Sequence, residues 1–280
     1  MSSRVLRFFA WIGITVLLGC ASAGKACAQN YFADWFDRVS ETQAEQPHWV
    51  TPLITVTPRL EEEFRYDFFS QNNAKGVITE AYGNGRGLEL IPAKPIEIIL
   101  GVTPYIQHNS PTVKDGAGDT PFLLKYRLFA GNEEHGNYIV TAFIGGSLPS
   151  GSYKNGATDA SITPTVAFGK GWGRFDFQST IGKSYPLGNT RVIGRPVAFN
   201  NAFQYRILKK IWPEVELNST FFPDGANAGK KQTFVTPGVL VGRIPLVSRL
   251  ALTLGAGVQI ATTQFHPTNH NWIFSMRLPF

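Results

Sequence analysis

From residue 60 onward, apolar and polar residues alternate along the chain in segments of about ten residues. In "EFRYDFF" (63–69) the aromatic residues at 64, 66 and 68 share one parity, and the charged residues share the other. "GRFDFQSTIG" (173–182) and "WPEVELNSTF" (212–221) show the same order. Because successive side chains of a strand point to opposite faces, these segments are predicted to be strands with one apolar and one polar face.

About twelve such strands are predicted, and each has the length that a tilted membrane strand needs. Their predicted ranges are 60–70, 80–91, 95–106, 118–130, 137–148, 159–169, 173–185, 197–208, 211–222, 231–243, 249–261 and 271–280.

The connections between these strands alternate in length. Short connections such as "IPAKP", "GNEEHG", "GKGWG" and "RIPLVSR" follow the even strands, whereas long polar ones such as "QHNSPTVKDGAG" and "PLGNTRVIGRPV" follow odd strands. This alternation is typical of outer-membrane proteins with short periplasmic turns and longer external loops. Residues 59–280 are therefore predicted to be all-β, a transmembrane antiparallel up-and-down β-barrel. Trp172 and Trp212 would join an aromatic girdle at the periplasmic turns, and Trp272 one at the external ends.

The N-terminus has the features of a secretory signal peptide of a Gram-negative bacterium. Arg4 and Arg7 precede an apolar run (8–19) that is too short to span a bilayer, and small residues follow. We expect residues 1–28 to be removed by cleavage after Ala28. "LLGC" offers the alternative of lipidation at Cys20.

Composition narrows the remaining possibilities. Both cysteines precede residue 28, so the mature chain has no thiol with which to form a disulfide. Its net charge falls from +6 to +3, because Arg4, Arg7 and Lys25 are lost with the signal, and so mild a charge does not indicate nucleic-acid binding. No later apolar run approaches the roughly 18 residues of a membrane helix, which leaves strands as the way to cross a membrane.

Residues 29–58 differ from the rest. "NYFADWFDRVSETQAEQ" spaces its apolar residues for a short amphipathic helix. This N-terminal periplasmic segment would lie at the membrane surface, plug the mouth of the barrel or be a mobile leading segment, and we expect the last of these.

Two stretches in the middle of the chain carry a family resemblance. "GDTPFLLKYRLF" (118–129) followed by "VTAFIGGSLPSGSY" (140–153) resembles the outer-membrane proteins of the meta-pathway phenol degradation, or putative transporter, family, and "TPRLEEEFRYDFF" (57–69) looks like the first strand of that family. The resemblance implies a β-barrel that admits small, often aromatic, molecules across the outer membrane. It supplies no catalytic or binding residues.

If the apolar face of each strand meets lipid, the polar face lines the lumen. Charges of both signs there would pair across the lumen or line a wet passage. The lumen-lining candidates are Glu63, Arg65, Asp67, Glu89, Glu97, Lys125, Arg127, Arg174, Asp176, Glu214, Glu216 and Arg277.

Catalytic or metal chemistry has little support. His266 and His270 lack the cysteine or acidic partners of a metal shell, and His108 with Ser110 gives no assured nucleophile and base geometry. We therefore expect no enzyme activity, metal or cofactor, and predict passive passage of small solutes, aromatic or hydrophobic in character. A closed structural or adhesive surface barrel and an outer-membrane hydrolase are the alternatives.

The expected partners follow from this location: outer-membrane lipids and lipopolysaccharide, the outer-membrane assembly machinery and a small-molecule solute, with no nucleic acid and a monomeric state. In "NWIFSMRLPF" every second residue is large and apolar, and this pattern resembles the signal that the assembly machinery reads. The residues of this assembly signal are Trp272, Phe274, Met276, Leu278 and Phe280.

Deletion of Phe280 tests the assembly signal. If the final aromatic residue is read before folding, its loss should reduce membrane insertion more than it reduces the stability of barrels that do insert. The measurement is the inserted fraction in cells beside the denaturant midpoint of the purified protein. Normal insertion of the truncated chain would count against the role.

Overall fold

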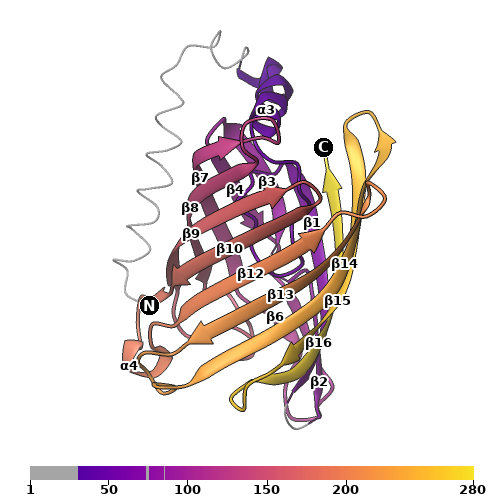
Figure 1. The fold of residues 1–280 in the computed structure, drawn as a ribbon. Helices are drawn as coiled ribbons and strands as arrows, with labels where there is room; N and C mark the ends of the chain where they lie inside the picture. Colours follow the sequence, from indigo (N-terminus) through magenta and orange to yellow (C-terminus); the bar gives the residue numbers. More distant parts are fainter. Residues whose placement is uncertain (1–30, 74–75, 85) are drawn as a thin grey trace, which may run out of the picture. The chain divides into compact units, whose positions relative to one another are not determined.

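The computed structural model describes residues 31–73, 76–84 and 86–280. The predicted signal peptide, with Ala28 and Cys20, lies outside the described residues. The chain divides into two units, residues 1–40 and residues 41–280. All the strands of the described residues belong to the second unit (Figure 1).

Residues 63–279 form a closed antiparallel barrel of twelve strands, as predicted, in which four of the strands are each split into two pieces. In chain order they are β1 (Glu63–Asn73), β2 (Ile78–Tyr82) with β3 (Gly87–Ala93), β4 (Ile96–Gly101) with β5 (Tyr105–His108), β6 (Gly116–Ala117) with β7 (Thr120–Gly131), β8 (Tyr138–Leu148), β9 (Ser161–Trp172), β10 (Phe175–Lys183) with β11 (Tyr185–Pro186), β12 (Val197–Tyr205), β13 (Ile211–Phe221), β14 (Lys231–Val247), β15 (Leu250–Ala261) and β16 (Thr268–Pro279).

The first and last strands close the sheet. β16 pairs with β1 antiparallel, from Glu63 opposite Pro279 to Asn73 opposite Thr268. The other edge of β1 pairs with β2 and β3. The main sheet therefore has no long free edge at which another chain could add a strand.

The two ends of the barrel differ. At one end, which we call the turn end, β3 and β4 are joined by Lys94 and Pro95, and β9 and β10 by Gly173 and Arg174. The other end, the loop end, carries the longer connections. One predicted connection, "RIPLVSR" (243–249), is wrong: β14 continues through Val247, with irregular pairing to β15, because only Ser248 and Arg249 are needed for the turn.

The outer face of the barrel is apolar. Large side chains such as Tyr126, Val166, Phe203, Leu254 and Phe274 are exposed there, while the residues between them point inward. An apolar band of this kind suits a hydrocarbon surrounding.

Helices are few among residues 31–280. α3 (Trp35–Ala44) begins before the barrel, and α4 (Thr190–Ile193) is a single turn in a connection at the loop end. In this described part of the chain, no helix has the length and apolar character needed to cross a membrane.

The closed ladder leads to a gel prediction. Unboiled protein should migrate differently from boiled protein on a denaturing gel, because detergent does not open a sheet that lacks free edges as readily as heat does. Identical migration of the two samples would argue against the closed barrel.

Candidate functional site

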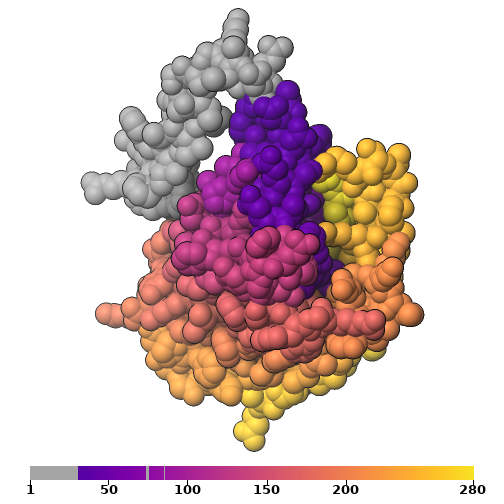
Figure 2. All heavy atoms as spheres, turned by 45° about the horizontal axis from the view of Figure 1, so that its top comes forward, coloured from indigo at the N-terminus to yellow at the C-terminus, as the bar shows by residue number. Residues whose placement is uncertain are grey.

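The interior of the barrel holds a loop of the chain itself. Residues 45–62, which we call the inner segment, enter at the turn end after α3 and return to the same end at the start of β1 (Figure 1). Gln46 joins the two limbs, since its side-chain amide donates to Leu60 O (2.7 Å) and accepts from Leu60 N (3.0 Å). Figure 2, with the turn end brought forward, shows atoms of the barrel wall on both sides of this part of the chain.

The inner segment is neither a helix nor a strand. Pro47, Pro52 and Pro58 have no backbone N–H, so the segment cannot complete a regular hydrogen-bond ladder. Its remaining N–H and C=O groups are nevertheless buried and require partners. Polar side chains of the barrel strands supply many of those partners, and side chains of the segment itself supply others.

Two carboxylates of β13 accept hydrogen bonds from the tip of the loop. Glu216 accepts from Ile54 N (2.7 Å) and Thr55 N (2.6 Å), and Glu214 accepts from Leu53 N (3.1 Å). The alternation of β13 places both carboxylates on its inward face, with exposed fractions of 4% or less. These two carboxylates therefore hold the tip of the loop by accepting hydrogen bonds from its backbone N–H groups.

Two guanidinium groups donate to the carbonyl groups just before this tip. Arg65 of β1 donates to Leu53 O (2.5 Å), and Arg277 of β16 donates to Pro52 O (2.8 Å) and to Thr51 O. A guanidinium has five donors in a fixed fork, so one side chain can serve two adjacent carbonyls.

The returning limb is held in the same way by the opposite wall. Lys125 of β7 donates to Arg59 O (3.0 Å), and its ammonium also lies 2.9 Å from a carboxylate oxygen of Glu97. Thr141 of β8 donates to Pro58 O (2.5 Å). Contacts from strands around the barrel therefore fix the inner segment on several sides.

Leu53 is the first apolar anchor of the segment. It is 1% exposed and packs where Gly238, Gly255 and Gly257 come together on β14 and β15. A Cβ at any of these glycines would lie 2.5–2.7 Å from a Leu53 methyl carbon, closer than such atoms approach. Glycine is required at these three positions because Leu53 approaches the strand backbone too closely to leave room for a Cβ.

Trp49 is the second apolar anchor. A Cβ at Gly169 or Gly171 of β9 would lie 2.5 or 2.6 Å from its indole ring. The sequence "GKGWG" was predicted to be a turn, but the structure places Gly169 to Trp172 within β9. Sequence reasoning missed both anchors; the available signal was glycine at inward positions of strands.

One predicted girdle residue lies inside the barrel. Trp212 is 7% exposed and packs with Val50, Leu53, Leu240 and Ile273. Its position in β13 has the parity of Glu214, which faces inward. Trp172, by contrast, is exposed and stacks on Phe175, with ring centroids 5.9 Å apart.

The predicted lumen-lining residues fall into three groups. The buried group inside the barrel comprises Glu63, Arg65, Asp67, Glu89, Glu97, Lys125, Asp176, Glu214, Glu216 and Arg277. Arg127 lies at the turn end, where it donates to Thr42 O (2.8 Å) and to Glu45 (2.6 Å). Arg174 is a correction: it is exposed in the turn between β9 and β10, because Gly173 with φ +63° ends the strand.

The interior toward the loop end carries neutral amides. Asn218 donates to Thr55 Oγ1 (3.4 Å) and to Asn200 Oδ1 (3.4 Å), and Asn271 donates to Gln259 (2.7 Å). Beyond the tip of the inner segment, the wall therefore offers neutral hydrogen-bonding groups.

At the turn end, polar contacts connect the end of α3 and the start of the inner segment to the barrel rim. Lys94 contacts Glu41 (2.7 Å), and His48 contacts Glu133 (2.8 Å). Partial burial raises the pKa of Glu133, but hydrogen bonds from the backbone and ring of His48 outweigh it and leave that pKa below its ordinary value.

The candidate catalytic and metal residues have other partners. His108 contacts Asn155 Oδ1 (2.6 Å), whereas Ser110 contacts Thr112 (3.2 Å). His266 contacts Asn269 (3.0 Å). Within the described ranges, no cluster of three or more His, Cys, Asp or Glu residues is arranged to hold a metal ion.

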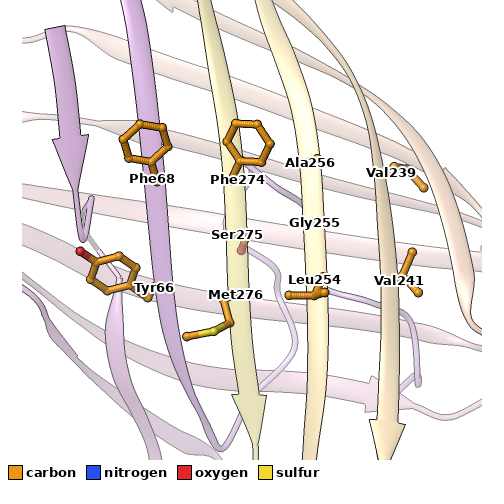
Figure 3. Close-up of a pocket in the computed structure, with 10 residues that line it drawn as sticks. All are labelled: Tyr66, Phe68, Val239, Val241, Leu254, Gly255, Ala256, Phe274, Ser275 and Met276. Carbon is orange, nitrogen blue, oxygen red and sulfur yellow. The ribbon is translucent and has the colours of Figure 1, made fainter.

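A groove of about 440 Å³ lies on the outer face of the barrel across β1, β16, β15 and β14 (Figure 3). Aromatic side chains including Phe68 and Phe274 line it, and Gly255 forms part of its floor. Gly255 also contacts Leu53 on the inner side. At this point only backbone separates the groove from the inner segment.

The carboxylate of Glu216 provides a test of the inner segment. Glu216→Ala leaves two buried N–H donors without their acceptor, at about 1–3 kcal/mol each, so the tip should leave the wall more often. Thr55→Cys, the sole cysteine after residue 27, should then react with a water-soluble maleimide about tenfold faster or more.

The matched control is Glu80→Ala in the same Thr55→Cys background. Glu80 accepts from Tyr82 on β2 (2.7 Å), away from the inner segment. Equal labelling rates in the Glu216 and Glu80 variants would show that the carboxylate does not hold the tip.

Comparison with known proteins supports the fold. No protein-family model matches the chain, and no curated protein matches it. An outer membrane channel from Pseudomonas putida F1 is similar in structure with a TM-score of 0.54, at 12% identity over 77% of this chain and 92% of that one. The NanC porin is similar with a TM-score of 0.51, at 8% identity over 78% of this chain and 98% of that one. The chain shares the barrel fold of these two proteins.

Proposed function

We propose that the chain is an outer-membrane channel for the passive passage of small solutes. The observation that carries this proposal is a closed barrel whose outer face is apolar and whose interior is polar. An apolar wall suits lipid, and in lipid a closed barrel is one of the two structures that satisfy every backbone group. A polar interior with charges of both signs is compatible with water and with solutes.

The proposal includes a location and partners. A signal peptide at residues 1–28 would direct export, the assembly machinery would insert the barrel as a monomer, and lipids with lipopolysaccharide would surround it. The solved proteins of similar fold are described as an outer membrane channel and as a porin, which supports this environment.

The inner segment would be the constriction of this channel. It occupies the turn-end part of the interior, and its polar contacts are hydrogen bonds, each worth about 0.5–1.5 kcal/mol net and more where a charge takes part, as at Glu216 and Arg277. A segment held by several such bonds can leave the wall transiently without unfolding of the barrel. Passage would depend on that movement.

The solutes would be small and aromatic or hydrophobic, the class that the meta-pathway family resemblance implies. Apolar side chains inside the barrel, including Phe69 and Ile273 near Leu53, offer such solutes contacts along the wall. No enzyme chemistry is proposed, since His108 and Ser110 have separate partners.

A second candidate is a closed structural or adhesive surface barrel. The burial of Leu53 and Trp49 against glycines favours it, because a segment packed this closely closes the turn end unless it moves. A measurement of conductance in planar bilayers separates the channel from the closed barrel.

Conductance in planar bilayers tests the channel. The wild type should show discrete openings, and Gly255→Leu should show larger or more frequent ones, because the new side chain takes the space of Leu53. Ala256→Leu is the matched control, since Ala256 faces the outer groove, and it should behave as the wild type.

Leu53→Ala removes the first apolar anchor of the inner segment without changing a residue of the barrel strands. It should also give larger or more frequent conductance openings. The boiled and unboiled gel assay shows that each variant is folded. Folded protein without conductance in the wild type, Gly255→Leu and Leu53→Ala alike would reject the channel and leave the closed barrel.

A further inference from the structure

A second cavity lies at the turn end beside the inner segment. It has a volume of about 260 Å³, and nine residues from the inner segment, the turn between β12 and β13, β13 and β14 line it. These residues are His48, Trp49, Val50, Arg206, Lys209, Lys210, Trp212, Gly242 and Arg243.

The rim of this cavity is strongly basic. Arg206, Lys209 and Lys210 are exposed, and within the part of the chain that the structure describes none of them has a carboxylate within 4.0 Å. Arg243 contacts Glu61 (3.2 Å), and His48 contacts Glu133. No lining residue is acidic, so Arg206, Lys209 and Lys210 give the cavity an excess of positive charge.

The base of the cavity is aromatic and apolar. Trp49 and Trp212, each 7% exposed, belong to the interior packing with Val50 beside them. The backbone fixes the basic turn next to this base, since Gly242 N donates to Lys210 O (3.0 Å). Leu208 and Lys209 have left-handed backbones, with φ of +48° and +65°, which form the tight turn that carries the lysines.

We propose that this cavity binds a small organic anion that has a carboxylate and an aromatic ring. The carboxylate would meet Arg206, Lys209 and Lys210, and the ring would lie against the indoles of Trp49 and Trp212. A phosphate offers the same charge, but without a flat apolar body it would leave the tryptophan base unused. This assignment rests on the proposed function in one respect, because it names the solute class that reaches the turn end of the channel.

Binding is measured on the full-length barrel in neutral detergent, without any conductance. Benzoate is the probe, and tryptophan fluorescence and calorimetry are the readouts. The variant Lys209→Gln/Lys210→Gln should bind benzoate with an affinity at least about tenfold lower, because two charge-assisted contacts are lost. Lys230→Gln/Lys231→Gln, an equivalent lysine pair at the loop end, is the matched control and should bind as the wild type.

The outcomes distinguish the possible ligands. Benzoate binding that the turn variant loses and the loop variant keeps supports the assignment. Equal binding of neutral benzyl alcohol, or unchanged binding in the turn variant, overturns it. Displacement of benzoate by lower concentrations of inorganic phosphate or of an anionic phospholipid would instead show a phosphate or headgroup site.

This experiment also separates the cavity from the channel. Conductance without benzoate binding would reject the anion site and leave the channel standing. Benzoate binding without conductance would leave the anion site standing on a closed barrel.

Discussion

The structure depends on one requirement: a loop of irregular backbone inside a barrel must find a partner for every buried N–H and C=O. Each buried group left without a partner would cost about 1–3 kcal/mol. Three prolines reduce the number of N–H donors in the inner segment. Side chains of the wall, together with Gln46 of the segment itself, are partners for other backbone groups. Carboxylates of the interior thus lie beside N–H groups of the inner segment, and guanidinium groups lie beside its C=O groups.

The same side chains also neutralise each other. Arg65 lies 2.9 Å from Asp67, and Lys125 lies 2.9 Å from Glu97, with each of these side chains almost completely buried. A buried pair of charges gains little by itself, because desolvation opposes the attraction. Here Arg65 and Lys125 also donate to carbonyls of the inner segment, so the pairs are retained for the backbone that they hold.

The sequence predicts the wall better than its contents. Alternation with a period of two identifies the twelve strands and, through parity, places residues such as Glu216 and Arg277 inside. It offers a plug in the mouth of the barrel only as one of three alternatives for residues 29–58, because the partners of the inner segment are far away in the chain: Leu53 meets Glu214 at a separation of 161 residues. Trp212 shows the same limit, because its type suggests a membrane girdle while its parity places it inside.

The seam that closes the barrel shows how the inner segment and the wall depend on each other. In the pairing of β1 with β16, Arg65 lies opposite Arg277. Like charges opposite each other weaken a sheet, and these two lie on the strands whose pairing completes the barrel. Pro52 O accepts from both guanidinium groups, and these contacts offset their repulsion together with Leu53 O and the Asp67 carboxylate at Arg65. Thr51 O does the same at Arg277. Closure of the seam and docking of the inner segment therefore stabilise each other, so movement of the segment in a channel must leave these guanidinium groups to water or to a solute anion.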